Sequence, residues 1–547
     1  MGPVLSVIAA LVALTLAQGG AGASGPHPEA LLFGLLLPHG IGLAARRASL
    51  AGQAARARRL ERVLSGAGWV SYSLLVLGAD WLGSIQQWTG EPMDLDSWPD
   101  RGLVFALAPF LLFEVSVIYA SARVHGGTPL MRRQLRSFQA RLLLACCAPI
   151  GLVVGLSLMV GQSSWLRTEV QYVGLAAFAF TVLMVCVIGM MLPRLLTWSW
   201  NTRPFPDDAR RDALSVVAGR AGFQPARLLE WQTGGLVANA AIVGLRERGK
   251  TVLFTDHLLS LLNMRELGAV YAHEIGHAKC RHVGAFIAWM CGMAFSGDVL
   301  FREVLEGEAL WLQGGAGGAL LLIWFAGFGW LSRRFELEAD LFSVEVQGDL
   351  PALISALERV GVRGRDATSW RHFSTARRVA FLERALVDPA FRAGFKRRLG
   401  RFRTAGVVVA LLGLALQGWS LSADLPGDRA VVQLARGEYA GAQSALRGLD
   451  GAEARELEPL VLAARSLPDA TAAAVRGGLV AALEAGDLDR AWALAQLALL
   501  REEAGVRPLA EALSQVREGD TAGALEQAKG QVGAWGLLLR AALEAQE

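Results

Sequence analysis

One short motif in the sequence has residue types and spacing suited to metal-dependent hydrolysis. The segment from Tyr271 to His277 reads YAHEIGH, an HExxH motif on a helix predicted over residues 264–282. Histidines four residues apart project from one helix face, so the imidazoles of His273 and His277 can reach one zinc ion. Glu274, the next residue along, can contact a water molecule bound to that ion. The motif therefore predicts a zinc-activated water with a carboxylate as general base.

Catalytic zinc needs a third protein ligand, and a second acidic segment can supply it. The sequence SRRFELEAD begins at Ser332 and holds the carboxylates of Glu336, Glu338 and Asp340. Glu336 and Asp340 are four residues apart, so on a helix one can bind the metal while the other orients a zinc-bound histidine. Glu338 is the competing ligand. The residues alone leave the choice between the two glutamates open.

The composition indicates that the elements positioning these residues lie in a membrane. Of 547 residues, 53% are hydrophobic and only 19% are charged. This balance is typical of chains with many lipid-facing segments. Two short or interrupted apolar runs, 31–45 and 284–300, are candidate spans. Apolar runs of about 18 residues or more predict further spans at 66–86, 102–121, 142–161, 171–193, 309–330 and 404–421.

The charges of the loops predict how these spans are oriented. The loops 46–62 and 123–141 are rich in arginine, whereas 90–100 holds four carboxylates and no basic residue. By the positive-inside rule the basic loops lie in the cytoplasm. The apolar stretch 284–330 then leaves and re-enters the cytoplasmic side, which places both halves of the predicted metal site on one face of the membrane.

A domain order follows from this pattern. A polar turn between the strand-like runs 236–245 and 251–255 predicts a β-hairpin just before the metal-binding helix. The predicted segments are 1–23, a cleaved signal peptide or a retained span; 24–199, a multi-span region; 200–403, the metal-binding domain with a membrane hairpin near 284–330; 404–421, the last span; and 422–547, an extracytoplasmic helical domain.

The segment 422–547 differs from the rest of the chain. It has nineteen acidic and twelve basic residues, although the whole chain carries a net charge of +4. A glycine followed by an acidic residue recurs at Gly437, Gly486 and Gly519, each five residues before an alanine. The last two are 33 residues apart, near the ~34-residue period of tetratricopeptide repeats, but the first interval is 49. We predict a helical repeat that could bind a protein partner, with an ordinary alanine-rich bundle as the alternative.

These motifs resemble one enzyme family. HEIGH followed by Arg281-His282, together with SRRFELEAD, is similar to the integral-membrane zinc endopeptidases that include the type I CAAX prenyl protease and the bacterial heat-shock membrane protease. The resemblance covers roughly 230–382 and leaves the C-terminal segment outside. It implies a peptidase acting on membrane-associated or misfolded proteins. It also implies one Zn2+ per chain, with His273, His277 and Glu336 as ligands and Asp340 beside them.

The resemblance implies roles for residues beyond the metal ligands. Asn239 lies in a segment similar to the edge strand that binds substrate in this family. His372-Phe373-Ser374 with Arg378 resembles the family's HPxxxxR element, whose histidine and arginine help hold the tetrahedral intermediate. This implies catalytic roles for His372 and Arg378. Phe373 stands where the family has proline, so the geometry at His372 departs from the family pattern.

Other residues are predicted to have no part in the chemistry. His257 and His282 are expected at the surface or the membrane edge, and the arginines of 364–403 are expected to face lipid headgroups as topology determinants. The basic residues cluster in loops, which argues against a nucleic-acid partner. The five cysteines form no CxxC pair, and all precede residue 292, so the C-terminal segment has no disulfide framework.

Two other function classes compete with a peptidase. A sensor-transducer resembling the β-lactam-sensing membrane receptors would also join a cytoplasmic zinc site to an extracytoplasmic domain. The motif details favour the prenyl-protease group, and 422–547 lacks an SxxK acylation motif. A catalytically inactive scaffold is disfavoured because every required group is present. The fold class predicted is mainly α: a polytopic helical membrane protein with a zincin-like α+β core and a C-terminal helical, tetratricopeptide-like domain, in a cell membrane of bacterial type.

Overall fold

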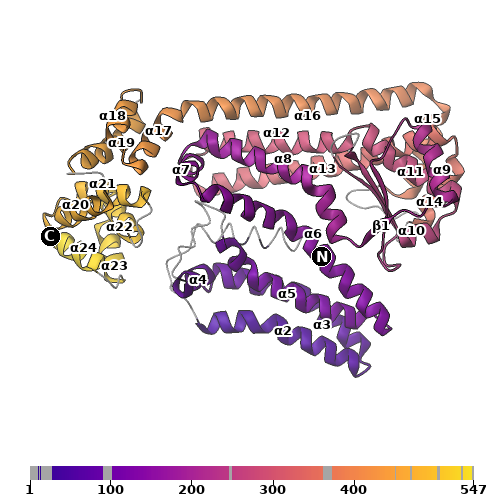
Figure 1. Cartoon of the computed structure of the whole chain (residues 1–547), viewed down its shortest axis with the longest axis horizontal. Helices are drawn as coiled ribbons and strands as arrows, with labels where there is room; N and C mark the ends of the chain where they lie inside the picture. The colour runs from indigo at the N-terminus through magenta and orange to yellow at the C-terminus, as the bar shows by residue number, and fades with distance from the viewer. Residues whose placement is uncertain are drawn as a thin grey trace. The chain divides into compact units, whose positions relative to one another are not determined.

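The chain is mainly helical, with one small mixed sheet (Figure 1). It is a polytopic helical membrane protein with an α+β core and a C-terminal helical domain, as the sequence predicts. The predicted site residue His372 lies outside the described residues. The computed structural model describes residues 10, 13, 28–89, 101–244, 249–360, 373–449, 451–467, 471–501, 506–530 and 534–544.

The chain forms two compact units. The first comprises residues 1–156 and 184–417, and the second comprises 157–183 and 418–547. The first unit therefore contains the sheet and the HExxH helix. The second contains the acidic C-terminal segment together with the loop between two membrane helices.

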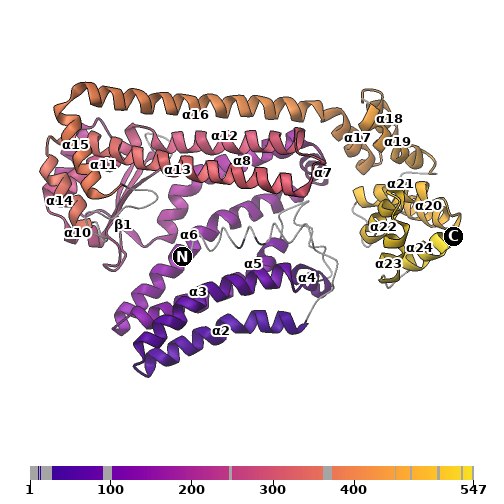
Figure 2. The same cartoon turned by 180° about the vertical axis from the view of Figure 1, so that it is seen from behind.

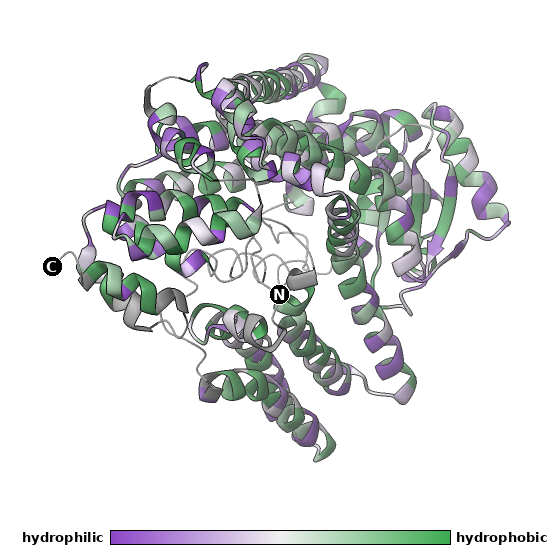
Figure 3. Cartoon of the chain, turned by 60° about the vertical axis from the view of Figure 1, so that its left-hand side comes forward, coloured by the Kyte–Doolittle hydropathy of each residue, from purple (hydrophilic) through white to green (hydrophobic). Residues whose placement is uncertain are grey.

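Six helices are long and apolar enough to cross a membrane. Apolar residues predominate along these helices (Figure 3). Each of the predicted spans from 102–121 onward overlaps one of them, and so does the short run 284–300. The helices are α5 (Arg101–His125), α6 (Pro129–Gly161), α8 (Gly174–Ser199), α12 (His282–Glu303), α13 (Leu310–Gln347) and α16 (Pro389–Ala423). The stretch 284–330 holds α12 and the first half of α13, which lie side by side (Figure 2).

The predicted span 66–86 is wrong as a single helix. Helix α3 (Ala54–Leu77) ends there, and α4 (Trp81–Thr89) begins four residues later. Asp80 between them adopts a positive φ of 50°, and its carboxylate accepts a hydrogen bond from the Gly83 amide at 3.1 Å. This aspartate caps the start of α4, so a new helix begins where the hydropathy alone continues. The run 31–45 lies within α2 (Pro28–Leu50), which packs along α3.

The sheet contains four short strands in the order β1-β2-β4-β3. The predicted hairpin is confirmed, because β3 (Ala240–Val243) pairs antiparallel with β4 (Thr251–Thr255). Strand β4 is buried along its whole length and also pairs in parallel with β2 (Arg227–Trp231). Strand β1 (Thr202–Pro204) closes the other side of the sheet. Among the described strands, β3 therefore has one free edge.

The predicted metal-binding helix is α11 (Met264–Lys279), which packs against the sheet. Asn263 and Glu266 form a capping box that fixes its start. Leu267, Tyr271 and Ile275 are at most 1% exposed and pack in one core with Phe254 of β4. Burial of this face leaves the opposite face of the helix, with both HExxH histidines, turned toward α13. Helices α9 (Ala209–Arg220), α10 (Asp256–Leu261), α14 (Leu350–Val360) and α15 (Thr375–Val387) complete this region.

The second unit is built from helix pairs. Gly437, Gly486 and Gly519 all have positive φ and end the first helix of a pair in each case. The alanine five residues after each glycine is completely buried, where the next helix packs. The recurring signature thus marks the turn inside a helical hairpin. The helices are α7 (Ser164–Tyr172), α17 (Leu425–Arg436), α18 (Tyr439–Leu446), α19 (Gly451–Arg465), α20 (Ala472–Glu484), α21 (Leu488–Leu500), α22 (Arg507–Arg517), α23 (Thr521–Gly530) and α24 (Ala534–Glu544).

Candidate metal centre

The structure brings together the three residues predicted to bind the metal. Donor atoms of His273, His277 and Glu336 all lie within 4.8 Å of one another. The two Nε2 atoms are 3.2 Å apart, and they lie 3.8 and 3.5 Å from the carboxylate oxygens of Glu336. Ligands about 2.0–2.1 Å from a tetrahedral zinc ion lie roughly 3.4 Å from each other. These residues therefore fit a zinc ion, and two imidazoles with one carboxylate form a donor set found in catalytic zinc sites.

A close contact between two helices brings Glu336 to the histidines. Gly276 lies between the two histidines of the HExxH motif. A Cβ at this position would be 3.0 Å from the Cα of Ala339. Only a residue without a side chain permits this approach of α11 to α13. Ala339 is itself small and completely buried. The two small residues therefore set the spacing that lets a carboxylate on α13 reach imidazoles on α11.

Asp340 contacts His273 on the ring nitrogen that faces away from the other donor atoms. The Nδ1 of His273 lies 2.9 Å from Oδ1 of Asp340, which is completely buried. Arg378 donates two hydrogen bonds of 2.6 Å to the same carboxylate. Its guanidinium is also 3.7 Å from Glu336. The arginine thus places one positive charge beside both carboxylates, and Nε2 of His273 faces Nε2 of His277.

The remaining candidate, Glu338, faces away from this cluster. Its carboxylate contacts Nε2 of His282 at 2.8 Å and the guanidinium of Arg403 at 2.9 Å. This geometry favours Glu336 over Glu338 as the metal ligand. Two predictions are wrong here: His282 is only 1% exposed, not at a surface, and Arg403 bonds to a buried carboxylate, not to lipid headgroups. The left-handed turn at Arg281 (φ 56°) folds His282 under α11, which the sequence does not reveal.

The electrostatics of α11 suit metal binding and general-base catalysis. In the metal-free chain, burial and the neighbouring His273 lower the pKa of His277 to about 3, so its imidazole is neutral, as a ligand must be. Burial would lower the pKa of His273 as well, but the hydrogen bond and charge of Asp340 raise it. Burial raises the pKa of Glu274 to about 7, with His273 opposing and Glu336 adding to the rise. A carboxylate with a pKa near 7 can both accept and return a proton at neutral pH.

Asn239 lies immediately before the free edge strand. Its amide donates to Oγ1 of Thr255 at 2.9 Å, and its carbonyl accepts from the Thr255 amide at 3.0 Å. The backbone of Asn239 is thus tied to β4 while its side chain is exposed. Strand β3 also packs against α11, the helix that carries the histidines. The predicted substrate-side segment therefore leads into a strand that contacts this helix.

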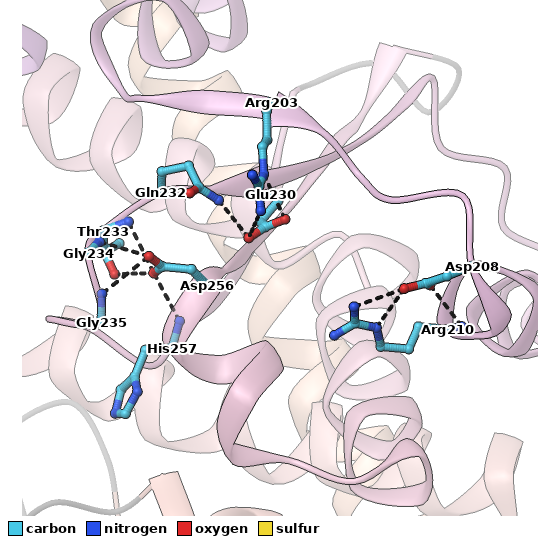
Figure 4. Close-up of polar contacts among 10 residues, drawn as sticks. All are labelled: Arg203, Asp208, Arg210, Glu230, Gln232, Thr233, Gly234, Gly235, Asp256 and His257. Carbon is cyan, nitrogen blue, oxygen red and sulfur yellow. Dashed lines mark hydrogen bonds and ion pairs between the residues drawn. The ribbon is translucent and has the colours of Figure 1, made fainter.

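One polar residue for which the sequence predicts no role holds the loop before this strand. The carboxylate of Asp256 accepts hydrogen bonds from the amides of Thr233, Gly234 and Gly235 at 3.1, 2.8 and 3.2 Å, and from the amide of His257 at 2.9 Å (Figure 4). Both glycines have positive φ, near 71° and 78°. The Thr-Gly-Gly sequence could have signalled this turn, since glycine adopts such backbone angles without strain. Partial burial raises the pKa of Asp256, but these hydrogen bonds lower it below its ordinary value.

The segment after His372 positions Arg378. Ser374 caps α15 by accepting a hydrogen bond from the Arg377 amide at 3.3 Å. The guanidinium of Arg377 lies 4.1 Å from the centre of the Phe373 ring. An aromatic residue where the resembling family has proline therefore makes a cation–π contact at the start of this helix. The cap begins the helix four residues before Arg378, which then projects toward Asp340.

Comparison with known proteins identifies a family. Residues 210–385 match the model of peptidase family M48. A protease HtpX homolog of Thermococcus sibiricus is 29% identical over 186 residues, 30% of this chain and 62% of that protein. A CAAX prenyl protease 1 homolog of Arabidopsis thaliana is 27% identical over 209 residues, 34% of this chain and 49% of that protein. The chain thus spans between 49% and 62% of the length of these two curated relatives.

One solved structure is also similar. The crystal structure of S. mikatae Ste24p covers 65% of this chain and 97% of its own, with 15% sequence identity and a TM-score of 0.37. The family match spans strands β2, β3 and β4, the HExxH helix, Glu336 and Arg378. The region with the three converging donor groups therefore matches the model of peptidase family M48, in agreement with the family that the HExxH and SRRFELEAD motifs predict.

Proposed function

We propose that the protein is a membrane-embedded zinc endopeptidase with one Zn2+ per chain, held by His273, His277 and Glu336. The observation that carries this proposal is the convergence of the three donor groups within 4.8 Å, inside the matched peptidase domain. When bound, zinc lowers the pKa of its water toward neutrality and polarises a peptide carbonyl. The substrates we propose are membrane-associated or misfolded proteins, which have extended segments near the bilayer.

Glu274 is the proposed general base. It follows His273 directly on α11. Its pKa is raised to about 7, so both the ionised and the protonated carboxyl group are available at neutral pH. Its carboxylate accepts a proton from the attacking water and passes it to the departing amine. His372 and Arg378 keep the catalytic roles that the family resemblance implies. The bidentate contact with Asp340 supports a further role for Arg378, which is to hold the aspartate that orients His273.

We propose that substrate binds as an added strand on β3. The order of the described strands leaves one edge of β3 without a neighbour, and β3 packs beside α11. An extended peptide can pair its backbone with such an edge regardless of its side chains. Asn239 at the start of the strand would contact the substrate. The mode of binding explains how one site could accept many unfolded sequences.

We also propose the orientation and the domain boundaries predicted from the loops. The metal site lies in the cytoplasm, and the segment 422–547 lies outside it, after the span 404–421. The basic loops 46–62 and 123–141 and the acidic residues of 90–100 support this orientation. The helical hairpins of the C-terminal segment would then bind a protein partner on the far side of the membrane.

A sensor-transducer is the second candidate function, and a contact in the second unit favours it. Glu169 on α7 is 6% exposed and binds Arg429 and Arg436 of α17 at 3.0 and 3.1 Å. This ion triad around a buried glutamate ties the C-terminal domain to the loop between α6 and α8. A partner bound to the domain could then act on membrane helices that lead to the peptidase.

The proposed function is tested on the full chain purified in detergent. Zinc content and cleavage of a fluorescein-labelled unfolded protein are measured for the parent, for Glu274→Gln, and for the exposed control Glu383→Gln. We expect about one zinc per chain in all three, with cleavage lost only in Glu274→Gln, because only the proton acceptor is removed. Substantial cleavage by Glu274→Gln would contradict the general-base assignment. A farnesylated peptide and its unmodified counterpart then show whether a prenyl group is recognised.

A further inference from the structure

His277 is held by a different set of groups from those that hold His273. Nδ1 of His273 reaches the Asp340 carboxylate directly. Nδ1 of His277 instead lies 2.8 Å from Nδ1 of a third histidine, His282. Nε2 of His282 lies 2.8 Å from the Glu338 carboxylate, whose other oxygen binds Arg403. A chain of four side chains therefore runs from the metal position to a helix that carries none of the proposed ligands.

The protonation states along this chain follow from its geometry. If His277 presents Nε2 to a metal, its Nδ1 carries the hydrogen and must donate. Nδ1 of His282 must then accept, so the hydrogen of His282 is on Nε2, where it is donated to Glu338. Arg403 neutralises the carboxylate at the end. The nitrogen and oxygen atoms that join these four side chains thus each have a partner of the right kind. No atom has to be donor and acceptor at the same time.

We infer that His282 is a positioning residue, which acts through His277 and is itself fixed by Glu338 and Arg403. This relay rests on the proposed zinc peptidase function and deepens it. Its role is to select the tautomer of His277 and to hold the plane of its ring, as Asp340 does for His273. The ring of His282 is stacked on Phe335 at 4.2 Å, which leaves it no freedom to turn away.

The same residues could instead form a second metal site. Donor atoms of Cys280, His282 and Glu338 lie within 4.8 Å of one another. A metal there would have to displace a hydrogen bond from His282 and compete with Arg403, which is positively charged and bonds both Glu338 and the carbonyl of Cys280. A guanidinium in contact with the donor group repels a cation, so the geometry favours the relay.

The relay also links four elements of the first unit. His277 is on α11, His282 on α12, Glu338 on α13 and Arg403 on α16. Helix α16 packs closely along α12, where Val409 lies 3.2 Å from the position of a Cβ at Gly292. A displacement of α16 along its axis would therefore pull on Glu338 and reach His277. The orientation of the His277 ring at the metal site therefore depends on the position of α16, the last membrane helix.

The experiment measures zinc affinity, because cleavage alone cannot separate positioning from catalysis. The full chain is purified in detergent, stripped of metal, and titrated with Zn2+ against a competing chelator. His282→Leu fills the space but removes the acceptor, and we expect the Kd for zinc to rise about 10–100-fold. His282→Asn places an amide oxygen near the former Nδ1, so most of the affinity should return. Arg403→Met should weaken binding less than His282→Leu, and the exposed control Arg401→Met should match the parent.

Two further readouts separate positioning from a loss of folding. The melting temperature without metal should be similar in the parent and in His282→Leu, while the rise in melting temperature on adding Zn2+ should shrink in the variant. The visible spectrum of the Co2+-loaded protein should change in His282→Leu and not in Arg401→Met. Equal zinc affinity in the parent and His282→Leu would overturn the relay. Two zinc ions per chain, one of them lost in Cys280→Ser, would replace it with a second metal site. A parent chain that binds no zinc would overturn the proposed function as well.

Discussion

Gly276 of α11 and Ala339 of α13 touch backbone to backbone, with 3.0 Å between the Cα of Ala339 and the place where a Cβ on Gly276 would stand. The contact lies between the two elements that carry the proposed zinc ligands. The distance between the histidines and Glu336 therefore depends on a residue that has no side chain.

Replacing Gly276 with alanine should push the two helices apart. The new methyl group meets backbone atoms and the Cβ of Phe342 at 3.2 Å, none of which can turn away. We expect a loss of about 1–3 kcal/mol in the free energy of unfolding and a clear fall in zinc content. The control is Gly284→Ala on α12, where a Cβ would meet nothing within 4 Å. Thermal unfolding and metal analysis of the two variants check this, and equal behaviour would refute the role of the contact.

The two glutamates of the SRRFELEAD segment should differ in their effect on the metal. Glu336→Ala removes a ligand and should leave a chain with little bound zinc after dialysis. Glu338→Ala removes a partner of His282 and should only weaken binding, because His273, His277 and Glu336 remain. Zinc content per chain after dialysis against a weak chelator measures both. If Glu338→Ala empties the site and Glu336→Ala does not, the ligand assignment is wrong.

The loop held by Asp256 should loosen in acid. Its pKa is lowered in the folded chain, so its stabilising contribution is present above the unfolded value of ~3.9 and is lost as the pH falls through the folded value. Asp256→Asn should lose about 1–2 kcal/mol of local stability already at neutral pH, since the charge-assisted bonds to Thr233 and Gly234 weaken. Hydrogen exchange of residues 233–243, corrected for intrinsic rates, measures this local stability.

The control for this prediction is Asp207→Asn, an exposed carboxylate near the same sheet. In this variant, the amides of residues 233–243 should exchange hydrogen at the same rates as in the parent at every pH. Protection of 233–243 in Asp256→Asn that equals the parent at neutral pH would show that the carboxylate does not anchor the loop. A further comparison of the Michaelis constants would show whether a loosened β3 binds peptide more weakly, as strand addition requires.

The orientation of the chain can be tested with single reporter cysteines. Ser444 on α18 and Ser260 on α10 are both exposed to solvent. In intact cells, a cysteine at 444 should react with an impermeant reagent, and one at 260 should react only after permeabilisation. The parent chain is the background control, because its own cysteines all precede residue 292. Protection of both reporters would place the helical domain in the cytoplasm and remove the crossing at 404–421.

Local sequence determined the parts of the site that depend on one element. His273 and His277 share a helix face because of the α-helical period, and Asn263 marks where that helix begins. The same reasoning found the β3–β4 hairpin and most of the membrane helices, since apolar runs and turn residues act over a few positions. The span at 66–86 failed because one capping aspartate, Asp80, starts a new helix inside an apolar run.

Tertiary structure alone decided which distant groups meet. Glu336 and Glu338 are two residues apart on one helix, so their side chains point to different neighbours, and only the packing of α11 on α13 selects Glu336 for the histidines. The burial of His282 does not follow from the local sequence, because it depends on the left-handed residue at 281 and on contacts with α13 and α16. The contact of His282 with Glu338 joins residues 56 positions apart, and that of Arg403 with Cys280 joins residues 123 positions apart. The periodicity of a single helix cannot predict which of these distant residues meet.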